Sequence, residues 1–304
     1  MKKDILTLLD LEKDDFDALL KRAFELKDRQ KKGIVEKSLS GKVLGLVFEK
    51  PSTRTRVSFE AAMARMGGSS IFIAAKDSQM SRDESVKDTA RALSGFLDVL
   101  AVRVYEHRTA EDFARWAHAP VINALTDLCH PCQVLSDLMT VAEYRGGYED
   151  VKIVWLGDAN NVAHSWINAA SALDLRLTLA CPREFLPDEK TLENARNKNG
   201  RRIEVVSDPL EAVQGADVIY TDVWTSMGQD RDEAKIQTLK PFQANRRLME
   251  AAGADGREVL IMHCLPAHRE EEITDDVMEG PGSVIWTQSE NKMHMHMAVL
   301  ETLI

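Results

Sequence analysis

The feature that most constrains the fold is an apolar run at 43–48, Val-Leu-Gly-Leu-Val-Phe, which leads into a turn and then a helix. A short apolar run bounded by turn residues is typical of a strand buried in a parallel sheet. The spacing predicts a helix over 57–66, which leaves Pro-Ser-Thr-Arg-Thr-Arg at 51–56 as the turn. Helix N-terminal N–H groups attract anions, and hydroxyls and two guanidinium groups add donors here. The turn is therefore a candidate phosphate site, with a helix cap and two surface arginines as the simpler alternative.

Charge and cysteine content limit the class of protein. The formal net charge is −10 over 304 residues, which disfavours general binding of nucleic acid or a membrane surface and requires local positive charge for any anion. Four cysteines in a chain of this length do not make a disulfide scaffold, so we expect a reduced, cytoplasmic protein. The first residues carry acids within their apolar stretch, unlike a signal peptide, and we expect no membrane span.

Short apolar runs alternate with helical segments through the rest of the chain. Further strands are expected at 70–75, 99–105, 120–123, 151–156, 175–180, 202–206, 217–221, 258–263 and 284–286. Further helices are expected at 84–96, 109–118, 134–144, 162–173, 189–199 and 289–303, with a mobile polar loop at 76–83. Right-handed crossovers make each half a parallel sheet, and Gly146-Gly147 marks the hinge. The predicted fold class is α/β, with two doubly wound domains, each a central parallel sheet flanked by helices, joined by interdomain helices.

Chemically capable side chains fall at the C-terminal ends of the expected strands, where α/β sheets bind ligands. They occupy 52–56, Arg103, 130–133, 157–161, 222–228 and 263–266. The first three clusters suit a phosphate and an adjoining polar carbonyl, although Arg103 alone also fits a solvent-facing edge strand. Asn161, Asp222 and Ser226 suit a substrate that carries an amine and a carboxylate. The pattern indicates two substrates that meet across a cleft, and the absence of Gly-x-Gly-x-x-Gly disfavours a nicotinamide dinucleotide.

Four segments resemble the signature motifs of ornithine carbamoyltransferases. They are Ser-Thr-Arg-Thr-Arg (52–56), His-Pro-Cys-Gln (130–133), Asp-Val-Trp-Thr-Ser-Met-Gly (222–228) and His-Cys-Leu-Pro (263–266). The first two are shared, in related form, with aspartate carbamoyltransferases, whereas Ser-Met-Gly and His-Cys-Leu-Pro point to the ornithine branch. The resemblance covers essentially the whole chain. It implies carbamoyl transfer from carbamoyl phosphate to the δ-amine of L-ornithine, giving L-citrulline and phosphate in arginine metabolism, without a metal or organic cofactor.

The resemblance also implies roles for individual residues. Carbamoyl phosphate would be bound by Ser52, Thr53, Arg54, Thr55, Gln79, Arg103, His130, Gln133, Cys264, Leu265 and Lys292. Ornithine would be bound by Asn161, Asp222, Ser226 and Met227. Gln79 would reach a neighbouring subunit's site from a loop, in a homotrimer or a multiple of trimers. The implied domains are 1–146 for carbamoyl phosphate, 147–288 for ornithine, and a C-terminal helix, 289–304, that returns to the first domain.

In the implied mechanism the neutral δ-amine attacks the carbamoyl carbon, and the tetrahedral intermediate expels phosphate. The catalytic residues would be Arg54, Arg103, His130, Asp222 and Cys264. Arg103 and His130 would donate to the carbonyl oxygen, and Arg54 would neutralise the leaving phosphate. Asp222 and Cys264 would orient the amine.

One position departs from the family pattern. Glu290-Asn291-Lys292 stands where the family usually has Glu-Asn-Arg, whose arginine contacts carbamoyl phosphate. Lysine keeps the charge but loses the planar fork, so its contact is expected to be more flexible. We expect Lys292→Arg to leave activity similar or to lower the apparent constant for carbamoyl phosphate.

Other interpretations of the same residues are open. Cys129 and Cys132 form a C-x-x-C, which fits a redox pair or, with His263 and Cys264, a four-ligand metal site, although the phosphate turn would then be unexplained. Rival functions are a carbamoyltransferase for aspartate, putrescine or an acylated ornithine, and a non-catalytic binding protein for carbamoyl phosphate or an amino acid.

Two further histidines lie in the last helix. His294 and His296 alternate with methionines. We expect both on the helix surface, where they would not act as ligands.

Overall fold

The structure, a computed structural model, describes residues 3–82, 84–173, 175–198, 202–225, 230–256 and 258–304. The chain forms two compact units: unit 1 is Met1–Met139 with Asn291–Ile304, and unit 2 is Thr140–Glu290. Both boundaries fall inside helices, α5 (Pro131–Arg145) and α12 (Ile285–Leu303), so each of these helices belongs to both units. Among the helices in the described ranges, none is both long and apolar enough to cross a membrane.

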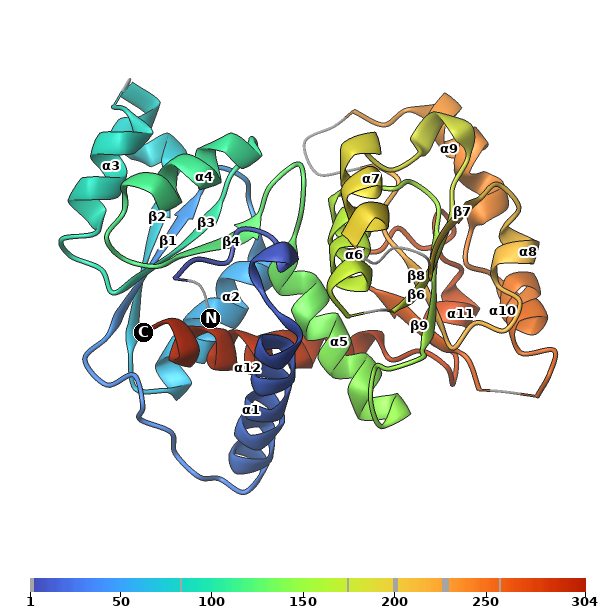
Figure 1. Cartoon of the computed structure of the whole chain (residues 1–304), viewed down its shortest axis with the longest axis horizontal. Coiled ribbons are helices and arrows are strands. Elements are labelled where there is room, and N and C mark those ends of the chain that lie inside the picture. Colours follow the sequence, from blue (N-terminus) through green and yellow to red (C-terminus); the bar gives the residue numbers. More distant parts are fainter. Residues whose placement is uncertain (1–2, 83, 174, 199–201, 226–229, 257) are drawn as a thin grey trace. The chain divides into compact units, whose positions relative to one another are not determined.

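Unit 1 is built on a four-stranded parallel sheet in the order β2-β1-β3-β4. Its strands are β1 Val43–Phe48, β2 Ser69–Ala74, β3 Val99–Arg103 and β4 Val121–Leu125. The apolar β1 is almost completely buried because it lies between β2 and β3 under helices on both faces (Figure 1). The chain leaves β1 and β3 in opposite directions, so the topological switch point lies between their C-terminal ends.

Helices cover both faces of the unit 1 sheet. They are α1 Lys13–Lys31, α2 Thr53–Arg65, α3 Val86–Leu93 and α4 His107–Trp116, with short 3-10 helices at Leu8–Asp10, Ala75–Asp77 and Gln79–Arg82. Figure 1 shows α3 and α4 on one face, and α2 with the C-terminal part of α12 on the other. Phe113 of α4 packs with Leu100 and Val102 of β3 in the core between sheet and helices. Burial of these apolar residues holds the ends of β1 and β3 in a fixed register.

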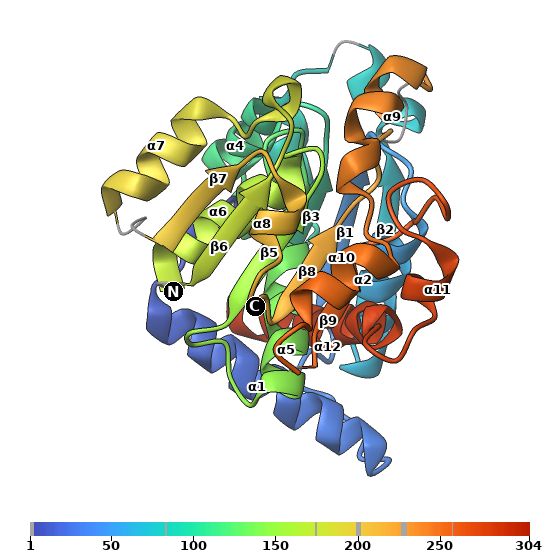
Figure 2. The ribbon, with the colours of Figure 1, turned by 90° about the vertical axis from the view of Figure 1, so that its right-hand side faces the viewer.

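Unit 2 repeats the design with a five-stranded parallel sheet in the order β7-β6-β5-β8-β9. Its strands are β5 Lys152–Leu156, β6 Arg176–Ala180, β7 Ile203–Val206, β8 Val218–Thr221 and β9 Leu260–His263. Its helices are α6 Asn161–Leu173, α7 Glu189–Lys198, α8 Pro209–Ala212, α9 Glu233–Leu239, α10 Arg246–Ala252 and α11 Asp275–Met278, with 3-10 helices at Arg183–Phe185 and Lys240–Phe242. Helices α6 and α7 cover one face of the sheet and α8 and α10 the other (Figure 2). The switch point of this sheet lies between β5 and β8.

The predicted fold class is confirmed, and β1 to β9 lie within two residues of the expected strand limits. The start of α2 was predicted wrongly. It begins at Thr53, not at 57, and Ser52 is its extended N-cap residue (φ −160°, ψ 119°). The hydroxyl and arginine residues suggested a turn, yet they form the first helical turn, whose N–H groups have no partner within the helix.

Two other local predictions are wrong. Residues 76–83 are not a plain loop, because two 3-10 helices occupy most of this stretch; Ser78 Oγ stabilises it by donating to the carbonyl of Ala75 (2.8 Å). No strand forms at 284–286, because α12 begins at Ile285. Val284 makes a backbone bond to Ile261 of β9 (3.1 Å), and a short apolar run does not by itself distinguish a strand from a buried helix start.

Candidate active site

The first part of the candidate site is the initial turn of α2 in unit 1. Thr55 is buried, Arg54 is partly exposed, and Ser52 and Thr53 line a cavity of about 680 Å³. The cavity walls come from β1, α2, β2 and the segment after β2. The helix N-terminus and these hydroxyls together form a cradle suited to an anion.

Arg103 ends β3 directly beside this turn. It is buried and pairs in the sheet with Phe48, the last residue of β1. The Glu49 N–H donates to the Arg103 carbonyl (2.8 Å), and Glu49 Oε2 accepts from the Tyr105 N–H (2.8 Å), which ties the two strand ends together. The alternative of a solvent-facing edge charge is therefore wrong: β3 is an interior strand, flanked by β1 and β4.

Lys50 is a cation that the sequence analysis did not single out. Burial lowers the pKa of its ammonium group, and the charge of Arg103 lowers it further. Lys50 Nζ lies 4.4 Å from the centre of the Tyr105 ring. The sequence signal that could have identified Lys50 is its position two residues after the end of β1.

Arg56 differs from the expectation that both arginines of the turn face an anion. Its Nε donates to Glu60 Oε1 (3.0 Å), and its guanidinium lies 3.7 Å from the centre of the Phe72 ring. Arg56 therefore connects α2 to β2, and it also lines the cavity together with Ser52 and Thr53.

His130 lies immediately before α5 and is buried. Burial holds the pKa of its imidazole well below the usual range, and the nearby charges of Lys292, Arg103 and His296 lower it further. The imidazole is therefore neutral at physiological pH. A neutral histidine beside an arginine is able to donate a hydrogen bond to a carbonyl oxygen without giving up a proton.

Gln133 lies in the first turn of α5 and is held at both ends of its amide. Its Oε1 accepts from Lys292 Nζ (2.7 Å), and its Nε2 donates to Asp137 Oδ1 (2.8 Å). Because the ammonium group of Lys292 has only donors, the amide oxygen must face Lys292, and Nε2 is left to donate to Asp137. All three side chains are buried, and Asp137 was missed because an acid inside a helix pattern normally reads as a surface residue.

The cysteines of the C-x-x-C motif act as structural thiols. Burial raises the pKa of both Cys129 and Cys132 to about 12, so neither is a thiolate at neutral pH. Cys129 Sγ donates to the Leu6 carbonyl (3.4 Å), and Cys132 Sγ donates to the Asn123 carbonyl (3.5 Å). Their packing shapes the loop that carries His130 and does not favour the redox hypothesis.

The candidate site in unit 2 begins at the end of β5. Gly157 has φ +109°, and a Cβ there would lie 3.0 Å from Trp224 Nε1, so only glycine fits. Asn160 then caps α6 with its Oδ1, which accepts from the Val162 N–H (2.9 Å), while its Nδ2 donates to Asp222 Oδ2 (2.7 Å). Asn161, the predicted ligand, is the first residue of α6. The sequence analysis included Asn160 in the cluster 157–161 but gave it no role, although a helix-capping signal would have identified it.

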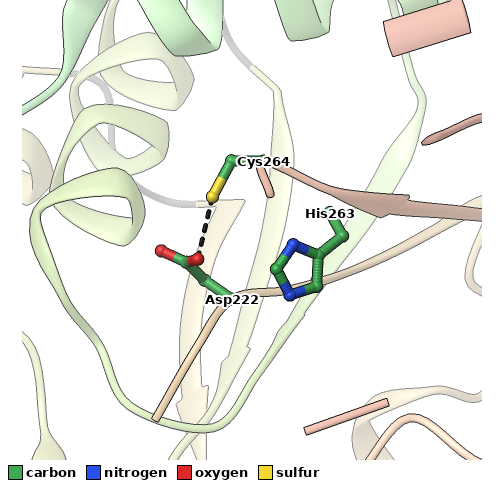
Figure 3. Close-up of side chains that lie close together, drawn as sticks. All are labelled: Asp222, His263 and Cys264. Atoms are coloured by element: carbon green, nitrogen blue, oxygen red, sulfur yellow. Dashed lines mark hydrogen bonds between the residues drawn. The ribbon is translucent and has the colours of Figure 1, made fainter. Parts of the chain in front are cut away.

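Asp222 is buried at the end of β8, and its carboxylate is the common hydrogen-bond acceptor of this part of the site (Figure 3). Cys264 Sγ donates to its Oδ1 (2.8 Å), and the Val223 N–H donates to the same oxygen (2.8 Å). Burial raises the pKa of the carboxyl group, while His263 and the hydrogen bonds from Cys264 and Asn160 lower it in part. The carboxylate is thus an acceptor held ready for a cationic or donor group.

His263 shows why this cluster is a poor metal site, although ligand atoms of Asp222, His263 and Cys264 lie within 4.8 Å of one another. His263 Nδ1 accepts from the Leu265 N–H (2.8 Å), and its Nε2 faces Glu272 Oε1 (3.1 Å). Both ring nitrogens are engaged in hydrogen bonds. The hydrogen bond from the Leu265 N–H to His263 Nδ1 also holds Leu265 at φ +60°. This conformation is uncommon for a bulky residue and is found most often at functional sites.

The structure does not place three of the predicted site residues with the others. Ser226 and Met227 lie outside the described residues. Gln79 is an exposed residue of the 3-10 helix after β2.

The prediction that His294 and His296 lie on the helix surface is wrong, since their exposed fractions are 1% and 0%.

Comparison with known proteins decides the family. Residues 3–143 match the carbamoyl-P binding domain of aspartate/ornithine carbamoyltransferases, and residues 149–303 match their Asp/Orn binding domain. The chain belongs to the aspartate/ornithine carbamoyltransferase family.

Individual relatives match over the full length. The chain is 48% identical to the ornithine carbamoyltransferase of Syntrophus aciditrophicus, with 100% of both chains covered. It is similar to the solved ornithine carbamoyltransferase of Pyrococcus furiosus, with 46% identity, a TM-score of 0.93, and 98% and 95% of the two chains covered. It is also similar to the anabolic ornithine carbamoyltransferase of Campylobacter jejuni, with 36% identity, a TM-score of 0.92, and 100% and 99% covered. The carbamoyltransferase family thus accounts for both halves of this chain.

Proposed function

We propose that the chain transfers the carbamoyl group of carbamoyl phosphate to the δ-amine of L-ornithine, producing L-citrulline and phosphate. Its family uses carbamoyl phosphate with either aspartate or ornithine. The observation that carries the choice is the buried Asp222 carboxylate, whose oxygens accept from Asn160, Val223 and Cys264. A fixed carboxylate attracts the amino group of ornithine and repels the side-chain carboxylate of aspartate.

The residues of unit 1 are assigned to carbamoyl phosphate. The phosphate is held by the first turn of α2, through Ser52, Thr53, Arg54 and Thr55, and Arg54 neutralises it as it leaves. Lys292 contributes through the amide of Gln133.

Arg103 and neutral His130 donate to the carbamoyl oxygen, where negative charge develops as the amine attacks. Removal of one such donor typically costs about 3 kcal/mol of barrier.

The residues of unit 2 are assigned to ornithine. The neutral δ-nitrogen forms a bond to the carbamoyl carbon, the bond from that carbon to the phosphate oxygen breaks, and the nitrogen passes its extra proton to the departing phosphate. Asp222 and Cys264 orient the amine, and the strained backbone at Leu265 supports the carbamoyl group beside Cys264. Asn161, Ser226 and Met227 complete the proposed ornithine ligands. No metal or organic cofactor takes part in this scheme.

The assembly, the domains and the location complete the proposal. We assign 1–146 to carbamoyl phosphate, 147–288 to ornithine, and 289–304 to a helix that returns to the first domain. We propose a homotrimer, or a multiple of trimers, in which Gln79 enters a neighbouring subunit's site. Val57 of α2 and Ile71 of the edge strand β2 support such an interface, because they are 54% and 50% exposed.

The cellular role follows from the relatives and the cysteines. A solved relative is named as an anabolic ornithine carbamoyltransferase, which favours a role in arginine biosynthesis. All four cysteines, each within the described ranges, are thiols, which fits the reducing cytoplasm that we propose as the location.

The experiment is a colorimetric assay of ureido products, without added metal. Carbamoyl phosphate is supplied in parallel with L-ornithine, L-aspartate, putrescine and N-acetyl-L-ornithine. We expect citrulline from ornithine and no product from the other amines. Turnover of another amine alone would overturn the assignment of Asp222, and no turnover with any amine would favour a binding protein.

A further inference from the structure

His296 occupies an unexpected place for a histidine of α12. Its ring stacks on Phe59 of α2, with the ring centres 3.7 Å apart and the planes 10° apart. Its Nδ1 lies 3.1 Å from the Ser58 hydroxyl. Phe59 lies one helical turn after Thr55, so His296 contacts the same helix that carries the proposed phosphate cradle.

The hydrogen-bond partners define the form of this imidazole. Ser58 Oγ donates its hydrogen to the Thr55 carbonyl (3.0 Å), so the same oxygen must accept from His296. His296 therefore carries a hydrogen on Nδ1, and its Nε2 is buried without a partner among the described residues.

The charges around His296 agree with a neutral ring. Lys292 lies one turn earlier on the same helix, and His130 faces the cluster from the start of α5. Burial lowers the pKa of His296 well below its usual range, and the charge of Lys292 lowers it further. A second proton on this ring would place like charges together in a buried site.

We infer that His296 is a positioning residue for carbamoyl phosphate: through Ser58 it fixes the backbone of Thr55, and through Phe59 it fixes the rotation of α2 against α12. This inference rests on the proposed function, because it assumes that the first turn of α2 holds that substrate. A histidine that only filled space would be replaceable by any ring of its size. A positioning histidine needs its Nδ1 hydrogen.

Two substitutions separate these roles. His296→Phe keeps the ring that stacks on Phe59 and removes the donor, whereas His296→Asn places an amide N–H near the position of Nδ1 and removes the stack. Ser58→Ala removes the acceptor from the other side. The matched control is His294→Phe, because His294 is equally buried on the same helix but contacts Gln30 of α1 (Nε2 to Oε1, 3.2 Å).

Steady-state constants for each substrate provide the measurement. One net hydrogen bond is expected to change KM for carbamoyl phosphate by about 3- to 10-fold in His296→Phe and in Ser58→Ala. KM for ornithine stays within about twofold in these variants. The KM of His296→Asn for carbamoyl phosphate lies between those of the parent and of His296→Phe. The double variant that combines His296→Phe with Ser58→Ala has a KM for carbamoyl phosphate no higher than that of either single variant. His294→Phe leaves the ratio of the two KM values unchanged.

Three results would overturn the inference: unchanged carbamoyl phosphate KM in His296→Phe, equal increases in both KM values, or additive effects in the double variant. Thermal unfolding with and without carbamoyl phosphate is measured in parallel, because ligand stabilisation reports binding without turnover. If the parent protein makes no citrulline, the proposed function fails. A carbamoyl phosphate-induced rise in Tm that is smaller in His296→Phe than in the parent would still support the positioning role, and an equal rise would refute it.

Discussion

Replacing Lys292 by methionine tests how this chain uses the position where its family usually has arginine. Methionine keeps the length and apolar stem of the side chain and removes its charge. The change deletes the 2.7 Å bond from Nζ to Gln133 Oε1 and leaves that buried oxygen without its donor. A hydrogen bond to a charged group contributes about 1.5–3 kcal/mol.

If the amide of Gln133 must be oriented to receive carbamoyl phosphate, loss of the hydrogen bond from Lys292 raises the free-energy barrier of the reaction by the same amount. We expect kcat/KM for carbamoyl phosphate to fall by about 10- to 150-fold. The free energy of unfolding should change much less, because removing a buried ammonium group also removes its desolvation penalty. Initial rates at saturating ornithine and urea unfolding measure the two quantities.

The background of Gln133→Ala provides the decisive comparison. If Lys292 acts through Gln133, adding Lys292→Met to that background changes kcat/KM by no more than about threefold. A full loss in the double variant would show that Lys292 contacts the substrate itself and would refute the reasoning. Lys292→Arg keeps the charge, so activity should stay similar or the carbamoyl phosphate KM should fall; a large loss would contradict the equivalence with the family arginine.

Two further predictions concern protonation and charge. Asp222→Asn removes the charge that holds the amine, so kcat/KM for ornithine should fall by about 100- to 10,000-fold with little change in carbamoyl phosphate binding; parallel loss of both would contradict the assignment. The folded-state pKa values of His130 and His296 lie below the ordinary value of 6.5, so the unfolded chain binds more protons than the folded chain as the pH falls below that value. The free energy of unfolding should therefore decrease below about pH 6.5, by up to about 1.4 kcal/mol per pH unit for each histidine, and should not depend on these groups above it. Urea unfolding from pH 8 to 5.5 measures the slope, which His296→Phe should reduce; an unchanged slope in that variant would contradict the prediction.

The strands and the places of the polar clusters were predictable because they depend on local pattern. A buried parallel strand needs a continuous apolar run, and β1 at Val43–Phe48 reads as one without any tertiary information. Because parallel strands present their carboxyl ends at one edge, the ends of β1, β3, β5 and β8 could be named as ligand sites in advance.

The partners of the functional side chains were not predictable in the same way. The partnership of Asn160 with Asp222 joins residues 62 positions apart, and it exists only because β5 and β8 are adjacent in the sheet. Lys292 and Gln133, which are 159 positions apart, meet because α12 and α5 pack within unit 1. Periodicity in the sequence reports which face of an element is apolar and does not report which element will face it.

The histidines of α12 show most plainly what the sequence determines and what only the tertiary structure determines. The sequence by itself determined a C-terminal helix, the residue types near the strand ends, and the family resemblance, because these depend on order along the chain. Only the tertiary structure decided that His296 is neutral, stacked on Phe59 and bonded to Ser58, since burial and partners set the state of a titratable ring. The same holds for Cys129 and Cys132, whose spacing fits a redox pair but whose burial makes them protonated packing groups.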